Sequence, residues 1–278
     1  MVRLFLSDRE KGDTPMAEFI SLYSGSSGNC SVVRCENRYL MVDMGKCCRT
    51  TVNALKELDL TIEDCDGILI THEHSDHVKG LNVFLKHYRV PVYGAADTLD
   101  MLASNGLVPP DADLVTLGQN APEDLGVFRV EMFRTSHDVP CVGYRIGTPD
   151  GKQMAIATDL GILTPGVHQA LTGCDLVALE SNYDLRMLRE GPYPYYLRAR
   201  IESPRGHLSN DECSAKVLEL IQEGCKKIAL CHLSRENNTP ELALSSVFRT
   251  LGAAGVIPTS DCVVQAQRRN EVSPPLVF

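Results

Sequence analysis

The sequence predicts an α/β protein in which buried strands carry polar side chains to one edge of a sheet. Four short apolar runs are each followed directly by a histidine or an acidic residue, and these four residues are His72, Asp159, Glu180 and His232. Functional groups in open α/β sheets gather beyond the carboxyl ends of the strands. Helices are also expected, because Ser209 and Glu212 have the spacing of a capping box.

The first residues are predicted to lie outside this fold. Residues 1–6 are too short and too quickly charged for a secretory signal, and residues 7–15 are polar or turn-forming. Strand-like alternation begins only near Phe19, and Met16 is an alternative start to Met1. We therefore expect a disordered tail over residues 1–15 and a single domain over residues 16–278.

Composition restricts the compartment and the type of binding. No run of 18 apolar residues occurs, so no membrane span is expected. Eleven irregularly spaced cysteines without a secretion signal indicate a reducing, cytoplasmic compartment, and Cys47, Cys48 and Cys141 are expected to be small buried hydrophobes. The net charge of −9 argues against broad nonspecific nucleic-acid binding but allows a local basic channel.

The loop from Ser24 to Asn29 contains two glycines and three serines. Its backbone N–H groups, with Ser26, Ser27 and Asn29, are candidates for contact with a phosphate group. A tight connection between two strands is the alternative interpretation.

Four potential metal ligands fall within six residues, directly after the apolar run at 67–71: His72, His74, Asp76 and His77. The first two can reach one ion together, while the last two point to a second ion. Two ions roughly 3.5–4 Å apart suit a hydrolytic site in which both polarise one bridging water. The alternative is a surface loop that happens to be rich in histidine.

Three later residues add to this cluster. His137 follows the strand-like run at 127–132 and is a candidate third ligand of the first ion, or else a structural histidine. Asp159 follows the run at 154–158, where it either bridges two ions or caps a turn. His207 precedes a helix expected from Cys213 to about Glu223, a place that favours anions, although a packed loop histidine is the alternative.

The remaining histidines, His87 and His168, lie in helix-like segments without a partner motif. We expect both to be structural or solvent-facing.

In order and spacing, seven of these residues resemble the metallo-β-lactamase superfamily, and Gly80 completes its His-x-His-x-Asp-His-x-x-Gly motif. The resemblance implies a four-layer αββα sandwich of two similar halves with two divalent metal ions at one edge. It implies that the first metal is bound by His72, His74 and His137, the second by Asp76, His77 and His232, and that Asp159 bridges. Zinc is expected for this ligand mix, with manganese and iron as alternatives.

Two further matches concern the substrate. Glu180 and His207 resemble the Glu–His pair of the tRNA 3′-processing endonucleases, in which the histidine protonates the leaving oxygen and the glutamate orients it. The chain resembles the WalJ (YycJ) group more closely, through segments such as Glu180-Ser181-Asn182 and Gly206-His207-Leu208-Ser209-Asn210. This resemblance implies a bacterial cytoplasmic exonuclease that acts on DNA 5′ ends. Tyr183 is a departure, because the group has histidine there.

Residues 183–207 depart from the acidic average, since they contain five arginines and four of the nine tyrosines. Guanidinium groups grip phosphates, and aromatic faces stack on unpaired bases for roughly 1–3 kcal/mol each. We expect Arg186, Arg198, Arg200 and Tyr193 to contact substrate, the alternative being a solvated connection with packed tyrosines. No long Gly/Pro-rich arm is present, which favours single strands or duplex ends over tRNA.

The resulting prediction is a binuclear metal-dependent phosphodiesterase, a 5′ to 3′ DNA exonuclease that acts through a metal-bridged hydroxide. Asp76 would accept a proton from the nucleophile, and His207 would donate one to the departing 3′-oxygen. The alternatives are an RNA-processing nuclease and a glyoxalase II-like thioester hydrolase. A non-catalytic regulator on this fold is a further alternative, but such proteins often lose ligands and none is missing here.

Overall fold

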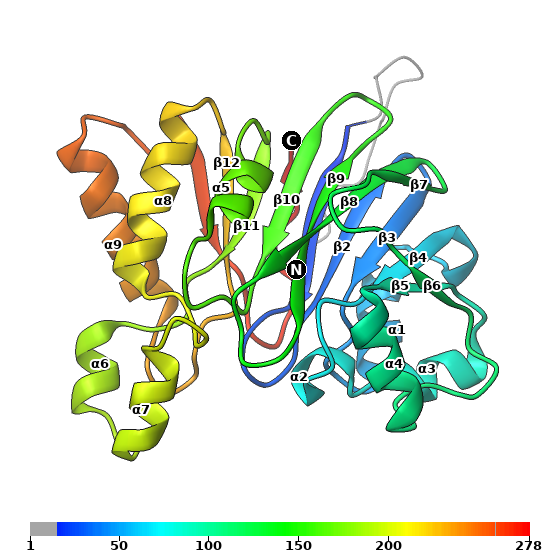
Figure 1. Cartoon of the computed structure of the whole chain (residues 1–278). Coiled ribbons are helices and arrows are strands. Elements are labelled where there is room, and N and C mark those ends of the chain that lie inside the picture. Colours follow the sequence, from blue (N-terminus) through cyan, green and yellow to red (C-terminus); the bar gives the residue numbers. More distant parts are fainter. Residues whose placement is uncertain (1–15, 259) are drawn as a thin grey trace.

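The computed structural model describes residues 16–258 and 260–278, so the expected tail at 1–15 lies outside the described residues. Within those ranges, the strands form two seven-stranded mixed sheets with helices on their outer faces (Figure 1). This arrangement confirms the predicted α/β class and the four-layer αββα sandwich. The single-domain assignment for 16–278 remains a prediction.

The two sheets repeat one pattern of strands. The first sheet has the order β14 (Leu276–Val277), β1 (Glu18–Tyr23), β2 (Cys30–Cys35), β3 (Arg38–Val42), β4 (Cys65–Leu69), β5 (Val92–Gly94) and β6 (Leu114–Thr116). The second has the order β7 (Glu123–Leu125), β8 (Phe128–Thr135), β9 (Cys141–Gly147), β10 (Gln153–Ala157), β11 (Leu176–Glu180), β12 (Lys227–Cys231) and β13 (Val263–Ala266). In each order the first four strands pair antiparallel, and the remaining three follow in parallel.

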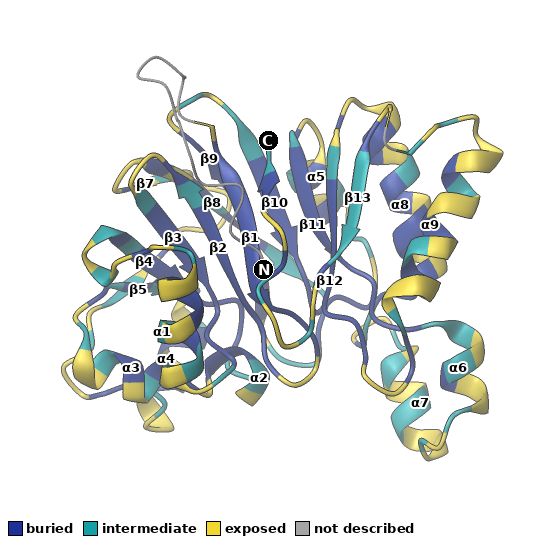
Figure 2. Ribbon diagram, turned by 180° about the vertical axis from the view of Figure 1, so that it is seen from behind, coloured by how far each residue is buried: buried dark blue, intermediate teal, exposed yellow. Residues whose placement is uncertain are grey.

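Helices cover both outer faces and one edge. The first sheet packs against α1 (Cys48–Glu57), α3 (Leu81–His87) and α4 (Ala96–Ser104). The second packs against α5 (Pro165–Leu171), α8 (Asn210–Gln222) and α9 (Pro240–Ala253). The short elements are η1 (Ile62–Asp64), α2 (Ser75–Val78), α6 (Leu185–Glu190) and α7 (Tyr195–Ile201). Of these, α2, α6 and α7 lie at the same edge of the sandwich (Figures 1 and 2).

Burial on both faces explains the continuous apolar runs of the sequence. In β11, Leu176 and Ala178 join the core between the two sheets, while Val177 and Leu179 join the core under the helices. A strand with two covered faces needs apolar residues at every position rather than at alternate ones. Figure 2 shows the central strands buried and the outer helices exposed on one side.

Two details of the sequence interpretation need correction. Helix α8 begins at Asn210, three residues before the predicted Cys213, because Ser209 is itself the N-cap and forms the capping box with Glu212. Cys47 is exposed and Cys48 half-buried, since both lie at the start of α1, whereas Cys141 is buried as expected. All eleven cysteines are free, and no helix among the described residues is long and apolar enough to cross a membrane.

Candidate metal centre and active site

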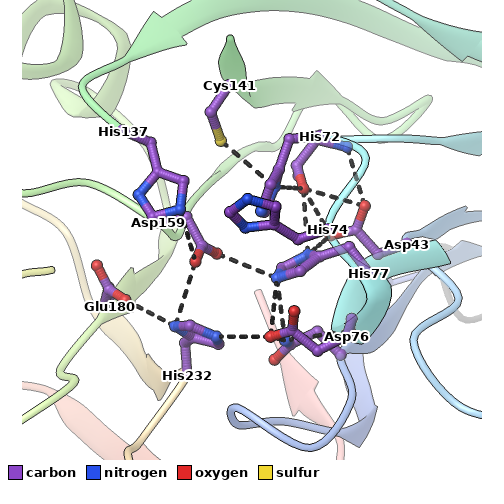
Figure 3. A network of polar contacts seen from close by, with 12 residues as sticks. Asp43, His72, His74, Asp76, His77, His137, Cys141, Asp159, Glu180 and His232 are labelled. Atoms are coloured by element: carbon purple, nitrogen blue, oxygen red, sulfur yellow. Dashed lines mark hydrogen bonds and ion pairs between the residues drawn. The ribbon is translucent and has the colours of Figure 1, made fainter. Parts of the chain in front are cut away.

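The candidate site is built where strands of both sheets end at one edge. The residues that follow or close these strands are Asp43 after β3, His72 after β4, His137 after β8, Asp159 after β10, Glu180 at the end of β11 and His232 after β12. His74 is the N-cap of α2, which carries Asp76 and His77. The side chains converge from separate elements on one small volume (Figure 3).

Three of these residues have left-handed backbone conformations. The φ angles are 63° at Asp43, 57° at Asp159 and 55° at His232. Non-glycine residues rarely adopt this region, and such strain is found where a site requires a particular side-chain direction. Here the conformation turns the chain sharply at a strand end and directs each side chain into the cluster.

The potential ligand atoms form two adjacent triplets with a carboxylate between them. The first triplet is His72, His74 and His137, and the second is Asp76, His77 and His232. Asp159 forms a further group with His72 and His77, and the ligand atoms within each group all lie within 4.8 Å of one another. These triplets coincide with the two ligand sets that the family resemblance implies.

The chemistry of the cluster fits divalent cations. His72 Nε2 is buried and makes no hydrogen bond, which is unusual for a buried polar atom outside a binding site. Burial also lowers the pKa of His72 well below its ordinary value, and the neutral imidazole is the form that binds metal. Asp159 Oδ2 lies 3.2 Å from His77 Nε2, and its Oδ1 lies 3.6 Å from His232 Nδ1, so its carboxylate borders the second triplet directly.

Asp43 is a positioning residue that the sequence interpretation missed. Its carboxylate lies 2.7 Å from His77 Nδ1 and accepts a hydrogen bond of 2.9 Å from the Thr71 backbone. A carboxylate on the second ring nitrogen sets the tautomer and orientation of a metal-binding histidine. The same signal that identified Asp159, a polar residue after a buried strand, would have found Asp43.

Replacement of Asp43 by alanine should weaken metal binding at the second triplet by roughly 10–100-fold, because His77 loses its orienting partner. Competition against a chromophoric zinc chelator measures the change. Asp124→Ala, which removes an exposed carboxylate paired with Arg129, is the matched control. Unchanged affinity in Asp43→Ala would show that His77 needs no such support.

Glu180 and His207 form a close pair beside the ligand groups. His207 Nδ1 lies 2.8 Å from Glu180 Oε1, and the backbone N–H groups of Leu160 and Leu208 donate to Glu180 Oε2. Burial raises the pKa of Glu180, but contact with the two histidines His207 and His232 lowers it to about 2, so the group is a carboxylate. Burial lowers the pKa of His207, whereas Glu180 raises it above its ordinary value and favours the protonated ring.

Glu180 has a second contact that the sequence did not predict. Its Oε1 also lies 2.7 Å from Nδ1 of His232, a member of the second triplet (Figure 3). One buried carboxylate therefore orients a candidate metal ligand and a candidate proton donor. Tyr183, at which the sequence departs from the WalJ group, is buried and contacts the start of α8. Its carbonyl oxygen accepts a hydrogen bond of 2.8 Å from the backbone N–H of Asn210.

A pocket of about 170 Å³ opens beside His207. Its lining residues come from six loops and α7: Ser26, His137, Asn182, Tyr193, Leu197, Arg200, Ile201, Arg205, Gly206, His207 and Ser234. Three of the predicted substrate contacts, Ser26, Tyr193 and Arg200, are therefore placed together. Asn29 lies instead beside the second triplet, with Nδ2 at 3.1 Å from His77 Nε2.

The other predicted substrate contacts lie outside this lining. Ser27 is exposed on its loop, Arg186 pairs with Glu190 on α6, and Arg198 donates to the Arg189 carbonyl.

Arg205 and Asp138 are further residues that the sequence interpretation missed. Arg205 Nε donates to the His137 carbonyl at 2.9 Å, and its Nη2 donates to the Asp138 carbonyl at 2.6 Å. The Asp138 carboxylate pairs with Arg200, and its Oδ1 lies 3.2 Å from His137 Nε2. These contacts tie α7 and the following loop to the first triplet.

Comparisons with known proteins agree with this geometry. Residues 45–231 match the β-lactamase superfamily domain. Exodeoxyribonuclease YycJ of Bacillus anthracis is 35% identical over 238 residues, or 85% of this chain and 90% of that protein. Exodeoxyribonuclease WalJ of Streptococcus pneumoniae serotype 2 (strain D39 / NCTC 7466) is 32% identical over 84% of this chain and 87% of that protein.

A solved structure shows the same fold. The metallo-β-lactamase fold protein YhfI from Bacillus subtilis aligns with a TM-score of 0.70 at 15% identity, over 93% of this chain and 99% of that chain. At this identity the likeness concerns the fold alone. The sequence matches, however, confirm the resemblance on which the ligand sets were predicted. The chain belongs to the metallo-β-lactamase superfamily of metal-dependent hydrolases, in which the exodeoxyribonucleases YycJ and WalJ are its homologues.

Proposed function

We propose that this hydrolase is a DNA exonuclease that removes nucleotides from 5′ ends. The observation that carries the proposal is the 2.8 Å contact between Glu180 and His207 beside the two ligand triplets. An alkoxide is a poor leaving group, so hydrolysis of a phosphodiester benefits from a placed proton donor. DNA is the proposed substrate because the YycJ and WalJ homologues are named exodeoxyribonucleases.

The residues around the site support an in-line hydrolysis. The chemistry that two bound divalent cations supply is a polarised water and neutralisation of charge on the phosphoryl oxygens. Burial raises the pKa of Asp76, but His232 and His77 hold it below its ordinary value, so the group is a carboxylate. In this ionised form it is the proposed acceptor of the proton from the attacking water. The water oxygen bonds to phosphorus, the P–O3′ bond breaks, and His207 donates its proton to the departing 3′-oxygen. The remaining strand keeps a 5′-phosphate.

Zinc is the cation we propose first, because imidazole and carboxylate ligands in this number suit it, and manganese or iron are the alternatives to test. We also propose a cytoplasmic location, which the eleven free cysteines support.

Helix α7 presents aromatic side chains for contact with an unpaired strand. Tyr195 and Tyr196 are 78% and 74% exposed, although large aromatic residues are usually covered. The helix stands at the edge of the sandwich that also carries α2 (Figure 1). Stacking of bases on exposed rings tolerates any sequence and requires no overall positive charge.

Replacement of Tyr195 and Tyr196 together by alanine should weaken binding of a short single-stranded DNA by about 1–3 kcal/mol for each stacked base. Fluorescence anisotropy with a labelled oligonucleotide measures the affinity. Phe248→Ala is the control, since Phe248 is 39% exposed on α9. Equal affinities of the unmodified protein, the double tyrosine variant and Phe248→Ala would show that α7 is not part of the binding surface.

Digestion of 5′-labelled and 3′-labelled DNA, single- and double-stranded, tests the function directly. We expect the 5′ label to appear at once as a mononucleotide, while the 3′-labelled strand shortens gradually. Early release of the 3′ label would show that digestion starts from the 3′ end instead. Cleavage of RNA or of a thioester, with DNA left intact, would refute the proposal.

A further inference from the structure

The pocket beside His207 must receive the group that leaves. His207 uses Nδ1 to contact Glu180, which leaves Nε2 as the ring nitrogen that can reach substrate. A proton donor works within hydrogen-bond distance of its acceptor, so the departing oxygen has to lie next to Nε2. Because His207 lines the pocket, the part of the substrate attached to that oxygen occupies the pocket.

The lining of the pocket combines two kinds of side chain. Tyr193, with Leu197 and Ile201 of α7, is half-buried and apolar over most of its surface. Ser26 and Ser234 add small polar side chains to the same lining. An aromatic and aliphatic wall suits the face of a nucleobase, and hydroxyl groups suit a sugar or a phosphate oxygen.

The lining of the pocket also carries positive charge. Arg200 and Arg205 line it, and both are held in place by contacts with the His137–Asp138 segment. A guanidinium group has five N–H donors, and the hydrogen bonds that Arg205 donates within residues 16–258 and 260–278 use Nε and Nη2. Its Nη1 is therefore available to a phosphate group.

Size limits what the pocket can hold. Its volume of about 170 Å³ is below the roughly 300–1,000 Å³ of sites that enclose drug-sized ligands. A space of this size suits one base of a DNA strand, which Tyr193 and Leu197 would contact.

We propose that this pocket holds the single nucleotide released at each turnover, with its base against Tyr193, Leu197 and Ile201 and its 3′-oxygen at His207. The proposal rests on the function proposed above and adds the residues that set the length of the product. Contact of a base with aromatic and aliphatic side chains tolerates any base, so all four nucleotides are the expected products, each released as a mononucleotide.

Filling the pocket is the first test. Leu197→Trp should raise the dissociation constant of thymidine 5′-monophosphate at least tenfold in isothermal titration calorimetry, and should slow mononucleotide release by a similar factor. Leu242→Trp is the matched control, because Leu242 is 39% exposed on α9, and it should leave both values unchanged. The metal content of each variant is measured in parallel and should stay equal to that of the unmodified protein.

Opening the pocket is the second test, and here the expected change is a longer product. Tyr193→Ala should weaken nucleotide binding and allow dinucleotides among the products of 5′-labelled DNA, which gel electrophoresis separates from mononucleotides. The pocket assignment would be wrong if Leu197→Trp kept full nucleotide affinity, or if Tyr193→Ala released mononucleotides alone. In either case, digestion of DNA by the unmodified protein would still support the proposed function. Failure of the unmodified protein to digest DNA would overturn both.

Discussion

Replacement of His207 by alanine should reduce the turnover of an ordinary DNA phosphodiester by about 10²–10⁴-fold, the usual contribution of a placed general acid. The physical reason is that the 3′-oxygen would then leave as an alkoxide, without a proton donor beside it. His207 belongs to neither ligand triplet, although it forms a further group with Asp159, Glu180 and His232, so an unchanged metal content is part of the expected result. Single-turnover kinetics on 5′-labelled DNA, with metal content verified in each sample, measures the effect.

An activated substrate separates this role from a general loss of structure. A nitrophenyl phosphodiester has a leaving group that needs no proton, so its hydrolysis by His207→Ala should fall far less than that of DNA. His168→Ala is the matched control, since His168 lies on α5 and contacts Lys216. Near-native cleavage of DNA by His207→Ala would refute the general-acid role.

Replacement of either His72 or Asp159 by alanine should lower the bound metal below two ions per chain and abolish hydrolysis. His72 is buried with its Nε2 free for a ligand bond, and Asp159 lies between the two triplets. Loss of a direct ligand should cost more than the roughly 10–100-fold in metal affinity that is typical of losing an orienting neighbour. Elemental analysis after gel filtration gives the number of ions per chain.

The control for this experiment is a histidine that lies away from the site. His87→Ala removes an exposed imidazole from α3 and should keep two ions per chain with full activity. Retention of two ions by both His72→Ala and Asp159→Ala would show that the ligand assignment is wrong. Treatment with a chelator should likewise stop hydrolysis in the unmodified protein, and added zinc should restore it.

Local pattern was sufficient to predict most of the candidate site. A buried strand reads as a short apolar run, and a functional residue at its end interrupts that run with a polar side chain. His72, Asp159, Glu180 and His232 all follow this rule, and the structure brings them to one edge. Asp43 follows the same rule and was overlooked, because a lone aspartate after a strand also suits an ordinary turn.

Surface segments were harder to interpret. From the arginines of residues 183–207 the sequence interpretation selected Arg186, Arg198 and Arg200, yet Arg200 and Arg205 line the pocket while Arg186 pairs with Glu190 on α6. The direction of a helical side chain depends on how the short helices α6 and α7 pack, and each has too few turns for its apolar face to be read from the sequence. Cys47 shows the same limit, because its exposure depends on where α1 begins.

The sequence by itself predicted the α/β class and the polar residues at the strand ends, because strand periodicity is a local property of the chain. Its resemblance to the metallo-β-lactamase superfamily implied the αββα sandwich and the two ligand sets, and its resemblance to the tRNA 3′-processing endonucleases implied the Glu180–His207 pair. Only the tertiary structure decided that Asp43 contacts His77, that Glu180 contacts His232 as well as His207, and that α7 lines a pocket beside His207. These features depend on contacts between residues far apart in the chain. Such contacts arise only when two sheets pack face to face and their strand ends meet.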